Sequence, residues 1–596
     1  MNRQADQRLR LIVVLFAIAF AVVFGRALYI QILQADALAA KARGQQNATI
    51  DVPTDRGRIL DRNGQALAVD VPSQDLMVHP SQVKDPLHTA AYIAQKLGYH
   101  QFTKPKHHKK GHPSKAHPSK AFGDEVNLLL RRLKAKGVVE GRVLSQLDPG
   151  VAAEIMAGKP PGLFLRASVR RGYPAGKLAS QLIGYTDSEN SGADGAGIER
   201  AYNSVLAGRD GKKLLVNGPG GVPLDTLTLQ KPRPGRDVQL TIDRSIQAKV
   251  QSVLDHTVST YSAHSATAIV LDPRSGQVLA MATAPGYDNN KLHDLTRKQF
   301  QRSSHNMAVE YSYEPGSTFK VVTMTAALTN HIVTPQTTFY HLPYALQVGD
   351  RVIHDDVQRG PVTLTAAQIL QQSSNVGTVT IARMVRKRPL YSWIQKFGFG
   401  KPTGIGLPAE AAPRVLPPND WYSSSIGNIP IGQGISVTPM QMASMYSAIA
   451  NGGVLVPPHV VESVGGHKLP VAPSRRIIGA DVDNTLVGML KGVVDTAAGT
   501  GVRARVCGYS VAGKTGTAQK ALPHSLGYST VNYVASFVGF LPASNPQVEV
   551  LVVVDSPRHD IFGGIVAAPA FQDIASFLTR AMAVQPDESQ SGCSSP

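Results

Sequence analysis

The chain has 596 residues, of which 43% are hydrophobic and 17% charged, so we expect a globular protein of two or three domains and exclude a disordered one. Its formal net charge of +19 favours acidic partners such as anionic lipid, nucleic acid or an acidic wall polymer. No nucleic-acid-binding motif accompanies the charge, and aromatic residues make up only 6%, so we expect a membrane or wall partner and no nucleic acid.

A long apolar stretch covers residues 11–33 and follows three arginines within the first ten residues. Its length is enough to span the hydrocarbon core of a bilayer, and the preceding positive charge predicts residues 1–10 in the cytoplasm and the remainder outside. A cleaved signal peptide is the alternative, but the stretch is long for one and no small-residue cleavage site is obvious. We therefore predict an uncleaved single-pass anchor.

Residues 34–235 alternate short strands, turns and helices, with residues 123–160 predicted to be helical. Within this region, residues 104–120 contain six lysines, four histidines and no acidic residue. Clustered histidines can indicate a metal site, but interleaved lysine, proline and glycine give no fixed ligand geometry. We expect a solvated, disordered loop there.

A change of composition at KPRPGRD marks the boundary that we expect before residue 236, and residues 236–582 form the predicted catalytic region. Residues 266–285 have the form of a β-hairpin that turns on Pro-Arg-Ser-Gly. Two strand-like runs and a helix-like run near the C-terminus predict an antiparallel sheet covered by helices. Residues 583–596 are expected to be a disordered tail.

The chain has two cysteines, Cys507 and Cys593, which are too few for a disulfide framework. Cys593 lies in the polar C-terminal stretch, so we do not expect the two to form a bridge. The cysteines therefore do not indicate in which cellular compartment the protein resides.

The first motif with chemical meaning is EPGSTFK, residues 314–320, in which a Pro-Gly turn precedes a helix-like apolar run. Ser317 is then predicted at the first turn of a helix, where free backbone N–H groups point outward, with Lys320 one turn later on the same face. A capping serine and a solvated lysine are the commoner explanation of this spacing, which Ser81 and Lys84 share without such a setting. The motif alone does not identify an enzyme.

Two further motifs follow in the same region: SSN at residues 373–375 before a helix-like run, and KTGT at residues 514–517 after a strand-like run. Each has an ordinary explanation, the first as a helix cap and the second as an exposed edge strand. A second Ser-x-Asn even occurs at residues 188–190. In the order SxxK, SxN and KTG, however, the three form the signature set of penicillin-recognising serine enzymes.

On these motifs the chain resembles the class B penicillin-binding proteins, and among them the division-associated D,D-transpeptidases of the penicillin-binding protein 3 type. The similarity covers nearly the whole chain and includes the segments RGRILDRNG, GIE, TIDRSIQ and GQGISVTPMQMA. Elongation-type relatives tend to carry an acid in place of the asparagine of SSN, so Asn375 favours septation. The stretch 104–120 is not expected of the family.

The resemblance implies an α+β penicillin-binding transpeptidase fold: an antiparallel sheet covered by helices, with an all-α subdomain. One transmembrane helix and an extended β-rich pedestal, residues 34–235, would precede it. It implies no cofactor and no metal. The implied partners are peptidoglycan stem peptides, β-lactams, a SEDS-family glycosyltransferase and other membrane proteins of the division apparatus. The implied location is the inner membrane, with the catalytic domain in the periplasm.

The resemblance also implies a covalent mechanism. Ser317 would attack the penultimate D-Ala carbonyl of a stem peptide, with Lys320 as its base. Lys320 must be neutral for this, through burial or a nearby cation such as Lys514. Ser373 would pass the proton to the departing D-Ala.

The other implied roles concern substrate binding. The backbone N–H groups of Ser317 and Thr517 would form the oxyanion hole, and Asn375 would hold the substrate amide. The terminal carboxylate would bind to Lys514, Thr515 and Thr517. Gly516, which has no side chain, would let the stem peptide lie along this strand as an added strand.

Other functions of the same chemistry are an elongation-type transpeptidase, a D,D-carboxypeptidase and a β-lactamase. The length of the chain and its anchor argue against a β-lactamase. A membrane scaffold that only binds β-lactams is a different class of protein. Such a scaffold would tolerate loss of the general base, whereas this chain keeps all the motif residues, which argues against that function. We therefore predict an active transpeptidase.

Overall fold

The computed structural model describes residues 3–36, 47–99, 120–135, 140–186, 195–217, 223–522 and 527–589. Residues 104–119 of the histidine- and lysine-rich stretch, the Ser-x-Asn at residues 188–190, and Cys593 lie outside these ranges. By their contacts, residues 1–55 and 208–235 form one compact unit, and residues 56–207 and 236–596 form another. The expected boundary between residues 235 and 236 stays a prediction.

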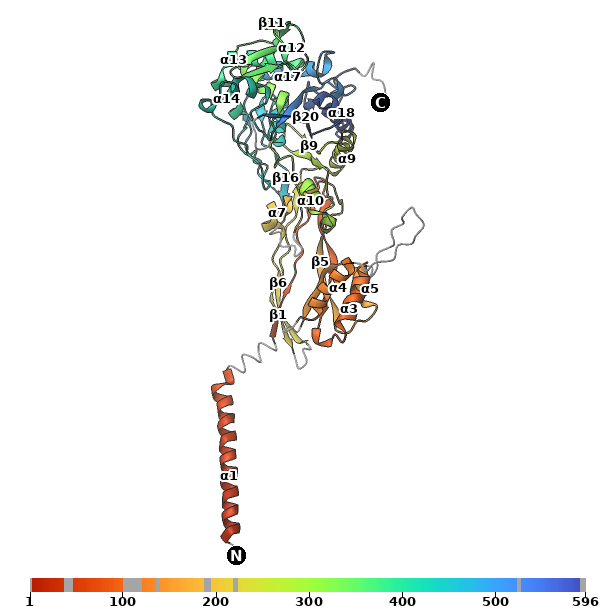
Figure 1. Ribbon diagram of the computed structural model, residues 1–596, viewed down its shortest axis with the longest axis vertical. Helices are drawn as coiled ribbons and strands as arrows, with labels where there is room; N and C mark the ends of the chain where they lie inside the picture. Colours follow the sequence, from red (N-terminus) through yellow and green to blue (C-terminus); the bar gives the residue numbers. More distant parts are fainter. Residues whose placement is uncertain are drawn as a thin grey trace, which may run out of the picture. The chain divides into compact units, whose positions relative to one another are not determined.

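The first unit begins with α1 (Arg3–Leu28), which continues into the π-helical turn η1 (Tyr29–Leu33) (Figure 1). The segment Arg8–Ile32 has a mean hydropathy of 2.7 and none of it is buried within the protein, as expected of a membrane anchor. The same unit contains an antiparallel sheet of strand order β1 (Asn47–Val52), β6 (Gly211–Asn217) and β7 (Pro223–Gln230).

The second unit contains a sheet of order β17-β16-β8-β2-β3-β4, with β5 also paired to β3. Its strands are β2 (Ile59–Leu60), β3 (Ala66–Val78), β4 (Gly141–Leu147), β5 (Leu163–Gly172), β8 (Val238–Leu240), β16 (Val461–Val464) and β17 (His467–Lys468). The sheet thus joins residues on both sides of the expected domain boundary.

Three helices pack around this part of the unit: α3 (Pro86–Lys96), α4 (Lys120–Leu133) and α5 (Pro149–Met156). The prediction of a continuous helical region over residues 123–160 is wrong, because β4 lies between α4 and α5. In β4 the side chain of Val143 is fully buried in the core beneath these helices, while the strand pairs with β3. This tertiary pairing outweighs the local helical pattern.

The RGR and GIE segments meet in a buried network of ion pairs. Arg56 contacts Glu199 at 2.8 Å, and Arg171 contacts the same carboxylate at 2.7 Å and Asp70 at 3.0 Å. All four side chains are at most 7% exposed. These two family segments therefore have a structural role, since they cross-link strands and helices that are far apart in the sequence.

Residues 236–582 contain an antiparallel sheet of order β10-β9-β21-β20-β19. Two of its strands, β9 and β20, are labelled in Figure 1. Its strands are β9 (Ser265–Leu271), β10 (Val278–Ala284), β19 (Ala512–Ala521), β20 (Tyr528–Leu541) and β21 (Val548–Asp555). The predicted hairpin over residues 266–285 is confirmed as β9 and β10. One face is covered by α9 (Arg244–Thr260) and α18 (Gly563–Ala581), which share a core with it.

The other face packs against helices that carry two of the three motifs. These helices include α11 (Lys320–Thr329), α13 (Asn375–Val385), α14 (Lys387–Lys396), α16 (Pro439–Ala450) and α17 (Ala480–Asp495). A small hairpin, β12 (Ala345–Val348) and β13 (Arg351–His354), leads into the segment that precedes α13. The expected α+β architecture, a helix-covered antiparallel sheet, is confirmed.

The expectation of a disordered tail is wrong for its first residues. Val584 is buried, and the Asp587 carboxylate accepts a hydrogen bond of 2.7 Å from the Ser510 backbone while its own N–H donates to the Gly508 carbonyl. Cys507 is disulfide-bonded, which contradicts the expectation of an unpaired thiol. The segment after α18 is ordered because the hydrogen bonds of Asp587 hold it beside residues 508–510.

Candidate active site

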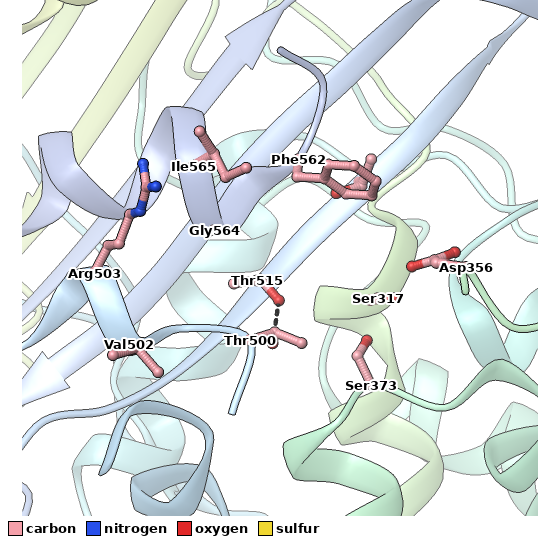
Figure 2. A pocket seen from close by; sticks show the side chains of 11 residues that line it. Ser317, Asp356, Ser373, Thr500, Val502, Arg503, Thr515, Phe562, Gly564 and Ile565 are labelled. Carbon is pink, nitrogen blue, oxygen red and sulfur yellow. Dashed lines mark hydrogen bonds between the residues drawn. The ribbon is translucent and has the colours of Figure 1, made fainter. Parts of the chain in front are cut away.

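A cavity of about 300 Å³ lies beside the first turn of the Ser317 motif and against strand β19 (Figure 2). Four of the predicted site residues line it, namely Ser317, Ser373, Thr515 and Thr517. The lining is completed by Asp356, Thr500, Val502, Arg503, Phe562, Gly564 and Ile565. The three motifs, which are spread over some two hundred residues of sequence, therefore meet at one site.

Ser317 lies in a short 3₁₀ turn, η5 (Gly316–Phe319), and Lys320 is the first residue of α11. Gly316 has a φ of +57°, and a Cβ there would come within 3.0 Å of the Thr517 carbonyl oxygen. Only glycine combines this backbone conformation with so close an approach. The Pro-Gly turn thus presents Ser317 directly against the strand that carries KTGT.

Lys320 is buried at 1% exposure, and its Nζ donates hydrogen bonds to the Ser373 carbonyl at 2.5 Å and to Ser373 Oγ at 3.1 Å. Burial lowers the pKa of Lys320 to about 8, although Asp356 and Asp355 partly oppose the shift. A lysine with this pKa is neutral in about a tenth of the molecules at pH 7, against fewer than about one in a thousand for a lysine of ordinary pKa. In the described part of the chain, no hydrogen bond joins Lys320 to Ser317. Hydrogen bonds between a base and its nucleophile are often long or poorly aligned until substrate binds.

Lys514 is also fully buried, and its Nζ lies 3.3 Å from Thr515 Oγ1, which in turn lies 2.7 Å from Thr500 Oγ1. Burial, followed by the positive charge of Lys320, lowers its pKa well below the usual range, and Asp356 opposes the shift. The expectation that Lys514 is the cation that makes Lys320 neutral is therefore not supported, since burial is the largest cause for both. Two buried ammonium groups repel each other, so the pair favours a single positive charge.

Ser373 has a φ of +59°, a conformation that is rare outside glycine and that turns its hydroxyl toward Lys320. The next residue, Ser374, caps α13 by accepting a hydrogen bond of 3.0 Å from the Gly377 backbone. Asn375 is half-buried and its amide donates to the His354 carbonyl at 2.9 Å. The structure does not place Asn375 among the residues that line the cavity.

Strand β19 is the edge of the catalytic sheet, so one side of its backbone is not paired within the sheet. A Cβ at Gly516 would come within 2.4 Å of Ser536 Oγ and 3.0 Å of the Pro315 carbonyl, so the absence of a side chain lets the serine loop approach. Thr517 Oγ1 accepts a hydrogen bond of 3.1 Å from the Gly563 backbone at the start of α18. These contacts fix the edge strand beside Ser317.

Sequence analysis missed several of the lining residues, above all Asp356, Thr500 and Arg503. They lie outside the three motifs, on the segment after β13 and on the loop after α17. Their local patterns, Asp-Asp in a turn and Gly-Thr-Gly in a loop, do not differ from those of ordinary surface turns. Within the described ranges, no group of three or more potential metal ligands occurs.

The comparisons with known proteins agree with this geometry. The penicillin binding protein transpeptidase domain matches residues 266–576, and the penicillin-binding protein dimerisation domain matches residues 51–240. The chain belongs to the penicillin-binding protein transpeptidase family. The order of its two domains is that of a class B penicillin-binding protein, and the family chemistry is serine acyl transfer, as expected.

Relatives of this class B penicillin-binding protein match it over almost its full length. It is 33% identical to the penicillin-binding protein PbpB of Mycobacterium tuberculosis, over 93% of this chain and 81% of the relative. It is 30% identical to the peptidoglycan D,D-transpeptidase FtsI of Escherichia coli, over 97% of this chain and 92% of the relative. A solved structure of penicillin-binding protein 3 from Mycobacterium tuberculosis, complexed with aztreonam, covers 90% of this chain and 98% of its own, with a TM-score of 0.67 and 28% identity.

Proposed function

We propose that this class B penicillin-binding protein crosslinks peptidoglycan stem peptides at the division septum as a D,D-transpeptidase. The observation that carries the proposal is the buried Lys320, which has a lowered pKa and contacts Ser373 beside the exposed face of Ser317. The relative named peptidoglycan D,D-transpeptidase FtsI supports the reaction. Asn375, where elongation-type relatives tend to carry an acid, supports the septal role.

In the first half of the reaction, neutral Lys320 takes the proton of the Ser317 hydroxyl, and Ser317 Oγ attacks the carbonyl carbon between the two D-Ala residues. The backbone N–H groups of Ser317 and Thr517 stabilise the oxyanion, a contribution that is typically worth about 10²-fold or more in rate per donor. The proton then passes from Lys320 through Ser373 to the departing D-Ala nitrogen. The product is an ester between Ser317 and the shortened stem peptide.

The terminal carboxylate of the donor is proposed to lie near Thr515, Thr500 and Arg503, on the side of the cavity where Lys514 is buried. A carboxylate there restores the favourable environment for a protonated Lys514. The stem peptide would add to the free edge of β19. Asn375, which contacts the His354 carbonyl in this structure, would exchange that bond for the substrate amide.

In the second half, an amine of another stem peptide attacks the ester and forms the crosslink. A β-lactam imitates the D-Ala-D-Ala end of the donor, reacts with Ser317 and leaves an acyl-enzyme that does not turn over. The solved relative complexed with aztreonam supports β-lactam binding by this chain.

We also propose that the N-terminus is cytoplasmic and the catalytic region extracytoplasmic. The arginines before residues 11–33 support this orientation. A SEDS-family glycosyltransferase and other division proteins would contact the anchor and pedestal. Replacing residues 11–33 by an unrelated membrane span should then abolish division function, and full complementation would refute a role beyond tethering.

The test of the enzymatic proposal uses the full chain in detergent, a fluorescent penicillin, and mass spectrometry to locate the adduct. We expect an adduct on Ser317 that is lost in Ser317→Ala and in Lys320→Ala. Ser81→Ala is the matched control, because Ser81 and Lys84 share the spacing but are both exposed. An adduct that survives Ser317→Ala would overturn the proposal.

A further inference from the structure

Two adjacent aspartates at the end of the β12–β13 hairpin have different surroundings. Asp355 is 7% exposed and accepts hydrogen bonds from the backbone N–H groups of Asn375 at 2.6 Å and Val376 at 3.0 Å. It also accepts from the Ser374 hydroxyl and pairs with Arg359. The Asp355 carboxylate is therefore occupied by these hydrogen bonds and this ion pair, which hold the start of α13.

Asp356, in contrast, is exposed and lines the cavity beside Ser317 and Ser373. Among the described residues it takes part in no ion pair, and its one hydrogen-bonding contact is a long one of 3.5 Å from the Asn375 amide. A contact of that length adds little. The carboxylate is thus available to a ligand in the cavity.

The charges of the cavity are arranged with opposite signs on opposite sides. Figure 2 shows Arg503, Thr500 and Thr515 on one side of Ser317 and Asp356 on the other. Among the described residues of the lining, Asp356 is the one acid and Arg503 the one base. The basic side suits the donor carboxylate, and the acidic side repels it.

We propose that Asp356 binds the cationic amine of the acceptor and thereby selects an amine over water for the second half of the reaction. The inference rests on the proposed function, which supplies the acyl-enzyme at Ser317. Alkyl amines of peptides have a pKa of about 10 and arrive as ammonium ions, which form strong charge-assisted hydrogen bonds to a carboxylate. The donor binds on the basic side, and the acceptor on the acidic side.

The chemistry of this step balances without a further reactant. The bound ammonium loses one proton to solvent at the open side of the cavity. The resulting amine nitrogen attacks the ester carbon, the C–N bond forms, and the bond from that carbon to Ser317 Oγ breaks. The second amine proton passes through Lys320, which became neutral when the first leaving group departed, back to Ser317 Oγ.

A competing role for Asp356 is charge balance for the two buried lysines, since it opposes the lowering of the pKa of both. The two roles differ in what they change. Charge balance affects how fast the acyl-enzyme forms. Acceptor selection affects how an acyl-enzyme, once formed, divides between amine and water, and this ratio does not depend on its rate of formation.

The experiment uses the full chain in detergent with a thioester analogue of the donor, and measures the ratio of aminolysis to hydrolysis by chromatography. Two acceptors are compared at neutral pH: D-alaninamide, which is protonated and lacks a carboxylate, and hydroxylamine, which is uncharged. We expect Asp356→Asn to lower the ratio for D-alaninamide by about five- to tenfold. The ratio for hydroxylamine should not change, and Asp356→Glu should retain part of the preference.

Asp350→Asn is the matched control, because Asp350 lies on the same hairpin, is 68% exposed in its side chain and is outside the cavity lining. If Asp356→Asn does not fold, the salt dependence of the aminolysis-to-hydrolysis ratio of the unaltered chain tests the inference instead. Raising the salt concentration should lower the ratio for D-alaninamide and leave that for hydroxylamine unchanged, because an exposed charge pair is screened.

An unchanged ratio in Asp356→Asn, or an equal fall for both acceptors, would overturn the inference. So would a ratio for D-alaninamide that does not depend on salt. Failure of the proposed function looks different, because no acyl-enzyme would form on Ser317 and neither product would appear.

Discussion

Lys320 Nζ lies 3.1 Å from Ser373 Oγ and 2.5 Å from the Ser373 carbonyl oxygen, so the proposed base and the proposed proton carrier are in contact before any substrate is present. Ser373 reaches this position through a φ of +59°, which a non-glycine residue adopts only where surrounding contacts hold it. Those contacts come from the α13 cap on one side and the buried Lys320 side chain on the other.

The pH dependence of acylation follows from the pKa of Lys320, which burial lowers to about 8. Only the neutral amine accepts the Ser317 proton, so the second-order rate of penicillin acylation should rise about tenfold per pH unit below this pKa and level off above it. Lys320→Arg, which stays protonated, should abolish acylation at every pH. A profile that still rises up to pH 10 would show that burial does not lower the pKa of Lys320.

A methyl group at Gly516 is expected to disturb the site without removing any reacting group. Its Cβ would lie 2.4 Å from Ser536 Oγ and 3.0 Å from the Pro315 carbonyl, so the serine loop and β19 must move apart. A displacement of this kind typically lowers the rate by about 10²-fold, and we expect such a loss in the acylation rate of Gly516→Ala.

Gly488→Ala is the control for this substitution, because Gly488 lies within α17 and a Cβ there meets nothing within 4 Å. It should leave acylation unchanged and raise the free energy of unfolding by about 0.5–1 kcal/mol. Equal acylation rates in Gly516→Ala and the unaltered chain would mean that the loop tolerates the methyl group.

Much of the site could be predicted from the sequence, because each motif is a local pattern whose residues share one element. The Pro-Gly turn places Ser317 at a helix start, as predicted. The strand expected before KTGT begins only at Ala512, so KTGT itself lies within the edge strand β19. The hairpin of β9 and β10 was predictable for the same reason, since its turn residues and its two strands are contiguous.

The rest depends on contacts between distant segments, which leave no local pattern. Asp356 and Arg503 reach the cavity because the β12–β13 hairpin and the loop after α17 are brought together by the fold. The ordered residues after α18 include Asp587, whose carboxylate accepts a hydrogen bond from the backbone of Ser510, 77 residues away in the sequence. A polar composition predicts disorder only where no such partner exists.

The buried ion pairs of Glu199 should be important for stability. Its carboxylate contacts both Arg56 and Arg171, so its removal takes away a buried negative charge that two buried guanidinium groups share and leaves Asp70 as the acid paired with Arg171. We expect Glu199→Ala to lower the free energy of unfolding by about 3–5 kcal/mol, measured by denaturant titration. The control is Glu140→Ala: Glu140 contacts Arg166 at 2.6 Å, but both side chains are more than 40% exposed, so the loss should stay below about 1 kcal/mol.

Asp483, in the first turn of α17, is 1% exposed, and within the described residues its Oδ1 has no hydrogen-bond partner. Burial raises its pKa to about 7, with Arg476 opposing the shift. The folded chain therefore binds more protons than the unfolded chain between about pH 4 and pH 7, so stability falls as the pH rises through this window and the loss is complete above it.

Asp483→Asn removes this titration and keeps the shape of the side chain. We expect the free energy of unfolding of the variant, relative to the unaltered chain, to increase by on the order of 1–3 kcal/mol between pH 4.5 and pH 8. Asp481→Asn is the control, because Asp481 lies on the same turn and is exposed, so its difference should stay nearly constant with pH. If the stability difference of Asp483→Asn is also independent of pH, the Asp483 carboxyl finds a partner that stabilises its charge.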